Sequence, residues 1–261
     1  MAYEHIIVEH RGRTSWIYLN RPNVLNALSM HTMGELRAVL TELRDRKETR
    51  VIVFSGKGRA FCAGADMTGA PDPTAPASDQ PTFITEANKM EEVLNTMPKP
   101  VIACLNGITC GGGLELAMMC DFILAAESAR IGDAHANFGM LPGGGATVRL
   151  PRLVGINHAK LLMYTGDLFP APEMLKIGLV QRVFADDALE TETQAIADKI
   201  AAKSPLGLAK MKRLIEGSFD MPTAQAIQAE KLNLIGHFNS YDAAEGGKAF
   251  AEKRKPEFRG Y

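Results

Sequence analysis

Three short apolar runs, separated by helical and glycine-rich segments, constrain the fold more than any other feature of this sequence. The runs are RVIVFSG (50–56), KPVIACLNG (99–107) and CDFILAA (120–126), and each is apolar through its centre. A strand that is apolar at successive positions is buried on both faces, as in a largely parallel sheet covered by helices. GGGLELAMM (111–119) has helical character and lies between the last two runs. This alternation predicts an α/β fold.

The N-terminal segments predict a hairpin followed by a helix. IIVEH (6–10) and TSWIYLN (14–20) have the pattern of two strands, and RGR between them is a tight turn. Ser29 is a suitable N-cap for a helix over 30–47. The apolar face of that helix is expected to contain Leu36, Val39, Leu40 and Leu43.

The character of the chain changes after about residue 155, where most segments show helical spacing. We expect a core over 1–195 that contains the functional site and includes the first of these helices. A C-terminal helical subdomain over 196–261 would cap that site or form subunit contacts. The stretch GAPDPTAPASDQP (69–81) is rich in Pro, Ala and Asp and is expected to be a loop. A loop of this length is either a substrate-binding lid or a surface connection.

Charge and cysteine usage narrow the function classes. The charges nearly cancel, with 29 Lys and Arg against 30 Asp and Glu, which argues against a general binder of nucleic acids or membranes. No apolar run reaches the roughly 18 residues of a membrane span, and the strand pattern begins too early for a targeting peptide. The four cysteines lack CxxC spacing, so we expect free thiols and a cytoplasmic protein. They are Cys62, Cys104, Cys110 and Cys120.

Two loops rich in glycine and alanine each follow an apolar strand. They are GKGRAFCAGADM (56–67) and NGITCGGGLELAMM (106–119). Small residues after a strand let the backbone approach a ligand closely, and a helix that begins at glycines presents free N–H groups. Two such loops side by side would offer two backbone donors to one oxygen, which is an oxyanion hole. The alternative is that the glycines serve only tight packing.

Glu115 is the only charged residue between Lys99 and Asp121. If the helix starts near Gly112, Glu115 lies in its first turn and on the same face as that glycine. Its neighbours are apolar, so burial is expected to raise the pKa of its carboxyl toward the range useful for acid–base catalysis. The alternative is a carboxylate that only complements the helix dipole.

Six segments, in order along nearly the whole chain, resemble the enoyl-CoA hydratase/isomerase (crotonase) family. They are LNRPNVLNALS (19–29), FCAGADM (61–67), NGITCGGGLELAMMCD (106–121), FGMLPGGGATVRLPRLVG (138–155), YTGDLFPAPEMLKIGLV (164–180) and EGGKAFAEKRKPEF (245–258). The resemblance implies a spiral of repeated ββα units followed by a helical trimerisation region. It also implies a homotrimer, or a hexamer of two trimers. The substrate would be a coenzyme A thioester, and neither a metal nor another cofactor is implied.

The resemblance also assigns roles to individual residues. The backbone N–H groups of Ala65 and Gly112 would form the oxyanion hole, and Glu115 would be the catalytic acid/base. Phe250 and Lys253 would complete the CoA site of the same or of a neighbouring subunit. The path of the CoA and acyl groups would follow Ala27, Ala63, Gly64, Ala65, Asp66, Met67, Gly111 and Gly112.

His135 stands where the hydratases of this family carry a second catalytic glutamate, twenty residues after the first. An imidazole also moves protons near neutral pH. Asp133 would face the same side of an extended segment and would fix the tautomer of His135. A metal site at His135 is not expected, because no partner lies at ligand spacing.

The reaction expected from these residues is the reversible hydration of a 2-enoyl-CoA by Glu115, with His135 assisting or positioning the water. A second possibility is hydrolysis of a carbon–carbon bond, or decarboxylation, of a CoA thioester by means of His135. Family hydrolases with histidine here carry an acid a few residues later, where this chain has glycine at Gly143, Gly144 and Gly145. A third possibility is acyl-CoA binding with little or no turnover, in which His135 is structural.

Overall fold

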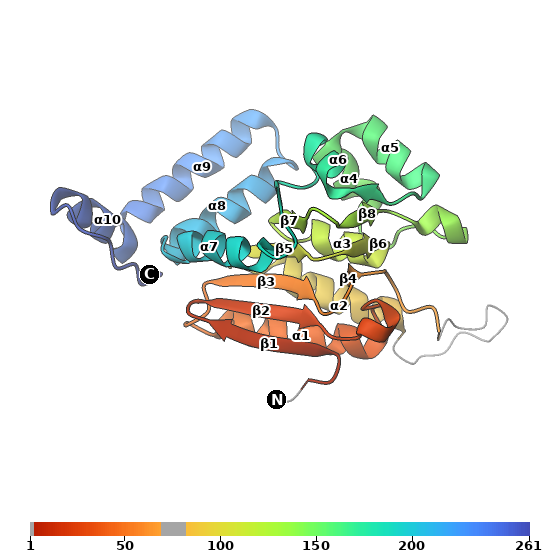
Figure 1. The fold of residues 1–261 in the computed structure, drawn as a ribbon. Coiled ribbons are helices and arrows are strands. Elements are labelled where there is room, and N and C mark those ends of the chain that lie inside the picture. Colours follow the sequence, from red (N-terminus) through yellow and green to blue (C-terminus); the bar gives the residue numbers. More distant parts are fainter. Residues whose placement is uncertain (1–2, 69–81) are drawn as a thin grey trace.

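The computed structural model of the chain describes residues 3–68 and 82–261, which form two sheets with helices packed around them (Figure 1). The loop expected over 69–81 lies outside the described residues. The α/β class predicted from the sequence is confirmed.

The first sheet has six strands in the order β1-β2-β3-β5-β7-β10. β1 and β2 pair antiparallel, so the predicted hairpin is confirmed. From β2 to β10 all neighbours pair parallel, and the three apolar runs form the central strands β3, β5 and β7. The strand bounds are β1 Ile6–Arg11, β2 Thr14–Leu19, β3 Val51–Gly56, β5 Val101–Leu105, β7 Phe122–Ala126 and β10 Arg182–Phe184.

A second sheet, which the sequence patterns did not predict, has four short strands in the order β4-β6-β8-β9. β4, β6 and β8 run parallel to one another, and β9 pairs antiparallel with β8. Strands of two or three residues are too short to show an alternation of apolar and polar positions. The bounds are β4 Ala60–Cys62, β6 Ile108–Cys110, β8 Arg130–Gly132 and β9 Phe169–Pro170.

Four consecutive ββα units build both sheets. The units are β1-β2-α1, β3-β4-α2, β5-β6-α3 and β7-β8-α4, with short 3₁₀ turns at Pro22–Val24 and His135–Phe138. From the second unit onward, each unit adds one strand to each sheet, so the chain climbs as a spiral. The spiral of ββα units implied by the resemblance is confirmed. The helices are α1 Met30–Asp45, α2 Phe83–Asn95, α3 Gly112–Met118 and α4 Ala146–Val154.

Helix α1 shows why these residues fold as they do. The Ser29 side chain accepts a hydrogen bond from the Thr32 amide at 3.1 Å, which confirms the predicted N-cap. The helix ends at Asp45, two residues before the predicted end. The four residues of the predicted apolar face are at most 1% exposed and belong to the main core. They are Leu36, Val39, Leu40 and Leu43.

The C-terminal part is helical, as predicted, and contains α5 to α10 together with β9 and β10. The expected division between residues 195 and 196 falls inside α7, which packs against strands of the first sheet. Helices α9 and α10 project away from both sheets (Figure 1). Among the helices of residues 3–68 and 82–261, none combines the length and apolarity needed to cross a bilayer. The bounds are α5 Ile156–Thr165, α6 Ala171–Lys176, α7 Leu189–Ala201, α8 Pro205–Ser218, α9 Thr223–Phe238 and α10 Tyr241–Ala251.

Candidate active site

The predicted catalytic residues follow the ends of three neighbouring strands. Ala65 comes after β4, Gly112 after β6 and His135 after β8. Because these strands are parallel and adjacent, their carboxyl ends lie at the same edge of the second sheet. Helix α3 begins at this edge (Figure 1). The topology therefore brings together groups that lie up to 70 residues apart in the sequence.

The backbone amides of Ala65 and Gly112 are neighbours. A Cβ placed on Gly112 would lie 3.5 Å from Ala65 N, and one on Gly64 would lie 3.5 Å from Gly112 N. The Leu28 amide donates to Gly64 O at 2.8 Å, and the Asp66 amide donates to Leu28 O at 2.9 Å. These bonds fix the loop on both sides of Ala65. Among the described residues, neither the Ala65 nor the Gly112 amide donates a hydrogen bond, so both are available to a ligand oxygen.

Two glycines allow this close approach of the loops. Gly64 has φ +107° and Gly111 has φ +54°, conformations that side chains rarely adopt. The Gly111 amide donates to Asp133 O at 2.8 Å. A Cβ on Gly111 would lie 3.5 Å from Gly64 Cα and 3.9 Å from Cε1 of His135. Gly111 thus lies between the loop after β4 and the loop that carries His135.

Glu115 lies in the first turn of α3, as predicted, and is only 5% exposed. Its Oε1 accepts hydrogen bonds from the amides of Gly144 at 2.7 Å and Ala146 at 3.2 Å. Its Oε2 lies 3.8 Å from His135 Nε2. Burial raises the pKa of the Glu115 carboxyl, and the two amide hydrogen bonds oppose that rise. The carboxyl is therefore oriented, nearly dry and adjacent to the imidazole.

Gly144 gives a structural role to the glycine run at 143–145, where an acid was expected in a hydrolase of this family. A Cβ on Gly144 would lie 3.0 Å from Glu115 Cδ and 3.0 Å from its Oε2. A side chain here would push against the carboxyl that the Gly144 amide holds. The run therefore positions Glu115, a role that a search for acidic side chains could not have found. The signal was the close spacing of glycines in PGGGA.

His135 lies between two carboxylates. Its Nδ1 is 3.1 Å from Asp133 Oδ1, and its Nε2 faces Glu115. Asp133 is 1% exposed. The hydrogen bond with Asp133 raises the pKa of His135, burial opposes the rise, and the charges of Asp133 and Glu115 add to it. The site therefore favours a protonated imidazole that donates from Nδ1 to Asp133.

The backbone around His135 differs from the extended segment that was expected. Ala134 has φ +61°, and His135 begins a 3₁₀ turn. The left-handed residue folds the chain so that the Asp133 and His135 side chains meet. The expected pairing is present, but a turn rather than an extended strand produces it.

Most of the residues expected near the acyl and CoA groups lie in two neighbouring loops, one before α1 and one after β4. The Ala63 amide donates to Leu25 O at 3.0 Å, and Leu28 forms a bridge with Ala65, which places Ala27 beside this loop. Met67 is 50% exposed at the end of the loop.

Asp66, expected on the same path, is held within its loop. Its Oδ2 pairs with an Arg21 nitrogen at 2.8 Å, and its Oδ1 accepts the Thr68 amide at 3.0 Å. Hydrogen bonds from Thr68, followed by Arg21, lower the pKa of Asp66 to about 2. Asp66 therefore holds the loop together.

Two expected residues lie outside this assembly. Phe250 is near the end of α10 and Lys253 follows that helix; both are exposed. Helix α10 lies at the opposite end of the molecule from α3 and the strand ends (Figure 1). Within one chain, therefore, Phe250 and Lys253 do not join the site.

Asn26 is a residue of the site's framework that the sequence reasoning did not single out. It is 1% exposed and has φ +58°, a conformation in which asparagine is favoured. Its Nδ2 donates to Ala60 O at 2.7 Å and to Lys57 O at 3.0 Å, and its Oδ1 accepts from the Arg21 amide at 2.8 Å. Asn26 thus fastens the loop before α1 to the loop before β4. Its position inside the motif LNRPNVLNALS was the available signal.

Comparison with known proteins agrees with this arrangement. The sequence profile described as enoyl-CoA hydratase/isomerase matches residues 11–261. A crotonyl-CoA hydratase from Syntrophomonas wolfei is 38% identical over 261 residues, with 99% of each chain covered. A short-chain-enoyl-CoA hydratase from Clostridium acetobutylicum is 35% identical, with 98% of each chain covered. The crystal structure of an enoyl-CoA hydratase from Bacillus anthracis matches with a TM-score of 0.92 and 36% identity, covering 99% of this chain and 100% of that one. The chain therefore belongs to the enoyl-CoA hydratase/isomerase family.

Proposed function

We propose that this protein is an enzyme that catalyses the reversible addition of water to the C2–C3 double bond of a 2-enoyl-CoA thioester. One observation carries the proposal. Glu115 Oε2 and His135 Nε2 lie 3.8 Å apart, in the same assembly of loops as the adjacent amides of Ala65 and Gly112. The relatives named as crotonyl-CoA and short-chain-enoyl-CoA hydratases support it.

The proposed reaction begins with the thioester carbonyl. Its oxygen accepts hydrogen bonds from the amides of Ala65 and Gly112, which draw electron density away from C3. Water adds to C3 while the Glu115 carboxylate takes its proton, and the C2–C3 π electrons move toward the thioester to form an enolate. The enolate then takes that proton from Glu115 at C2. One water is consumed, Glu115 returns to its starting state, and CoA enters only as part of the substrate.

His135 has a positioning role in this proposal. With Nδ1–H donated to Asp133, the protonated ring directs Nε2–H toward Glu115 and toward water held between them. The positive charge stabilises the Glu115 carboxylate, which is the form that accepts a proton. The second glutamate found in family hydratases would instead place another negative charge here.

Crotonyl-CoA followed at the absorbance of its enoyl thioester tests the proposal. Because Glu115 carries the proton, Glu115→Gln should lower kcat by about 10²–10⁴-fold. His135→Ala should cause a smaller loss, and His158→Ala, which changes an exposed histidine on α5, should leave turnover unchanged. A loss below about tenfold in a folded Glu115→Gln variant would contradict the assignment.

The same assay separates the alternatives. Unchanged absorbance together with cleavage of a β-diketone or β-carboxyl CoA thioester would replace hydration by carbon–carbon cleavage. Unchanged absorbance with tight binding of crotonyl-CoA would indicate an acyl-CoA binder without turnover.

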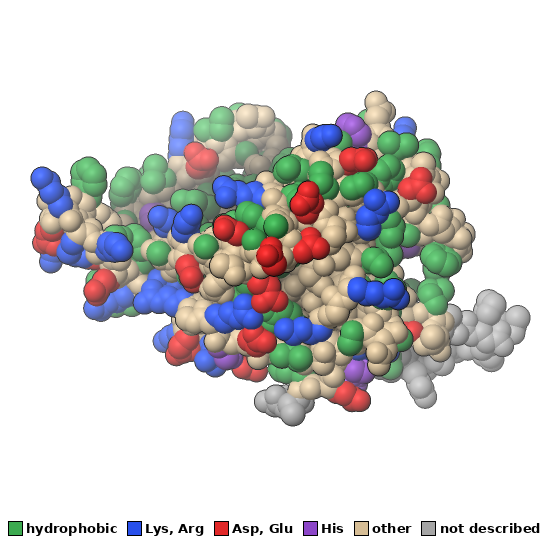
Figure 2. All heavy atoms as spheres, viewed as in Figure 1, with side chains coloured by type: hydrophobic (Ala, Val, Ile, Leu, Met, Phe, Trp, Pro, Cys, Tyr) green, Lys and Arg blue, Asp and Glu red, His purple; other side chains and the backbone are tan. Residues whose placement is uncertain are grey.

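We also propose that the protein assembles as a homotrimer, or as a hexamer of two trimers, through the helices that follow α7. None of the residues of α9 is buried, although Leu232, Ile235 and Phe238 are large and apolar. Hydrophobic side chains are visible on this projecting part (Figure 2). Phe250 and Lys253 would then reach the CoA of a neighbouring subunit, while the loop around Ala63 and Met67 holds the acyl part. Mass measurement by light scattering tests the assembly.

A cytoplasmic location is part of the same proposal. All four cysteines are free thiols, and Cys62, Cys104 and Cys120 are buried. Burial raises the pKa of the Cys104 thiol to about 11, which makes it unreactive. Free, unreactive thiols suit a reducing compartment. Fractionation of the source cells would test the location.

A further inference from the structure

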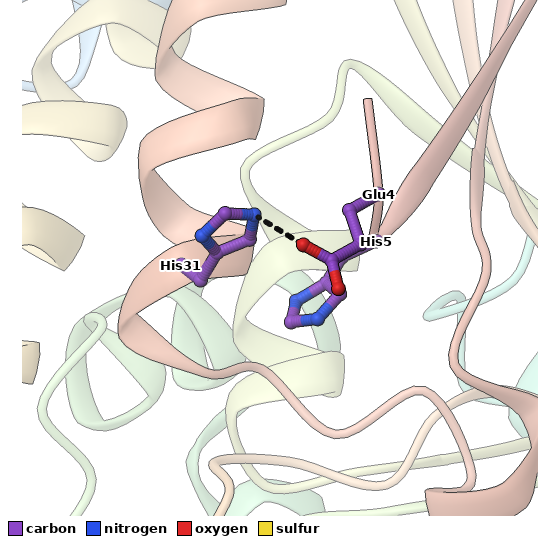
Figure 3. A group of neighbouring side chains, drawn as sticks. All are labelled: Glu4, His5 and His31. Atoms are coloured by element: carbon purple, nitrogen blue, oxygen red, sulfur yellow. Dashed lines mark ion pairs between the residues drawn. The ribbon is translucent and has the colours of Figure 1, made fainter. Parts of the chain in front are cut away.

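Glu4, His5 and His31 gather where the segment before β1 meets the first turn of α1. One ligand atom from each of the three side chains lies within 4.8 Å of the others, and Glu4 Oε2 is 3.7 Å from His31 Nε2. Figure 3 shows the Glu4 carboxylate directed at the His31 ring, with the His5 ring beside it. We propose that these three side chains form a binding site for a divalent metal ion of the Zn²⁺ class.

The spacing of one donor pair is close to what such an ion requires, and the third donor lies within 4.8 Å of both. With Zn–N and Zn–O bonds of about 2.0–2.2 Å, tetrahedral ligands lie roughly 3.4 Å apart. The Glu4–His31 separation of 3.7 Å nearly meets this requirement. The side chains of Glu4 and His31 are 78% and 54% exposed, so they are free to close on an ion.

Two hydroxyl groups hold the ring of His5 in place. Its Nδ1 lies 3.0 Å from Thr32 Oγ1 and 3.3 Å from Ser29 Oγ. Among the described residues, its Nε2 has no hydrogen-bond partner, so that nitrogen remains for a metal. A hydroxyl on the far nitrogen fixes the ring as second-sphere partners do in known sites.

Glu35 positions two of the ligands. Its carboxylate accepts the amides of Glu4 at 2.6 Å and His5 at 2.8 Å, which ties the N-terminal segment to α1. Its Oε1 also lies 3.2 Å from His31 Nε2. An ion bound to His31 Nε2 would displace the proton on that nitrogen and end its contact with Glu35, while Glu35 kept its two amide partners.

The donor set selects the kind of ion. Two imidazoles with one carboxylate suit Zn²⁺, Ni²⁺ or Cu²⁺, whereas Mg²⁺ and Ca²⁺ prefer oxygen ligands alone. Three protein ligands leave one tetrahedral position for water. The proposal departs from the expectation that the chain holds no metal. Spacing motifs could not reveal this site, because His5 and His31 lie on different elements, 26 residues apart.

Calorimetric titration of the untagged full-length protein with Zn²⁺ tests the site. The protein should bind one ion, and His5→Ala and His31→Ala should each weaken binding by more than about tenfold. His158→Ala, in which an exposed histidine of α5 is removed, is the matched control and should bind as the parent does. Mg²⁺ should give no binding heat. Zn²⁺ should also raise the thermal unfolding midpoint of the parent and of His158→Ala, but not of His31→Ala, because the ion joins the N-terminal segment to α1.

Two results would overturn the proposal. The first is an absence of Zn²⁺ binding by the parent protein, which would leave the cluster as an ordinary group of surface ion pairs. The second is binding that persists unchanged in both histidine variants. Titration with Co²⁺ would then locate the ion, since thiolate ligands produce an intense sulfur-to-metal band that imidazole and carboxylate do not.

Discussion

Replacing Gly112 with proline removes one of the two backbone N–H groups proposed to bind the thioester oxygen and places the ring Cδ where that N–H pointed. Gly112 is the first residue of α3, a position where proline is well tolerated. Gly111 before it has φ +54° and ψ −130°, outside the right-handed helical region that a following proline disfavours. The Gly112 amide donates to no other described residue, so no internal hydrogen bond is lost. Folding should therefore survive the change.

The expected loss follows from what remains in the site. The Ala65 amide, the Glu115 carboxyl and the His135 ring keep their positions, because other hydrogen bonds hold them. Removal of one preorganised donor then lowers kcat by about 10²–10³-fold, which corresponds to about 2.7–4 kcal/mol of transition-state stabilisation. The affinity for product should change much less, because the oxyanion hole acts most strongly on the charge that develops in the transition state.

The assay follows the loss of the enoyl-thioester absorbance of crotonyl-CoA, with circular dichroism and thermal unfolding as checks on the fold. Ile156→Pro is a matched control. Ile156 is the first residue of α5, is 60% exposed, and follows Gly155 with φ +78°. This control places proline in the same helical position away from the catalytic edge, and it should retain parental kcat.

A folded Gly112→Pro variant whose kcat falls by less than about tenfold would refute the oxyanion-hole assignment. Equal losses in Gly112→Pro and Ile156→Pro would also refute it, because the effect would then come from proline at a helix start. A loss of kcat confined to Gly112→Pro, with the affinity for product retained, supports it, because a ring that merely blocked the site would weaken product binding as well.

Three further substitutions probe the framework of the site. Asp133→Asn removes the main cause of the raised pKa of His135, so the ring should titrate nearer 6.5. The high-pH limb of the kcat profile should then move to lower pH. An unchanged profile would show that the protonated ring is not required. Asn26→Ala leaves buried polar groups unpaired and should cost about 3 kcal/mol in urea unfolding. Gly113→Ala should cost a similar amount, about 3 kcal/mol, since its Cβ would lie 2.2 Å from Cys62 O; a stability loss below about 1 kcal/mol would contradict either estimate.

Local patterns were enough to predict five of the six strands of the first sheet, all but β10, and also α1. The apolar runs became the central strands because continuous burial leaves a clear mark on a sequence. Ser29 and the apolar face that follows it mark the start of α1 by capping and by periodicity. Glu115 stood out for a related reason, since a charge among apolar neighbours needs partners if it is buried. In the structure those partners are the Gly144 and Ala146 amides.

The features that were missed depend on strand pairing or on the backbone, and neither leaves a side-chain pattern in the sequence. The strands of the second sheet are too short to have a pattern, and only their pairing makes them strands. The turn at Ala134 places a non-glycine residue at positive φ, which no residue preference predicts. Gly144 acts through its amide, and an amide is the same in every residue except proline. Sequence patterns record side-chain preferences, so functions carried by the backbone remained hidden until the fold was known.

The spiral explains how this site tolerates an imidazole in place of a carboxylate. Ala65 belongs to the second ββα unit, Gly112 and Glu115 to the third, and His135 to the fourth. The proposed oxyanion donors are backbone groups fixed by strand pairing and by the loop bonds around Leu28, so the identity of the side chain at 135 does not disturb them. What His135 changes in the proposed mechanism is charge, because a ring that can carry a positive charge lies between Asp133 and Glu115 where a second glutamate was expected. In that mechanism Glu115 acts as the single proton carrier, while the proposed amide donors stay as the fold sets them.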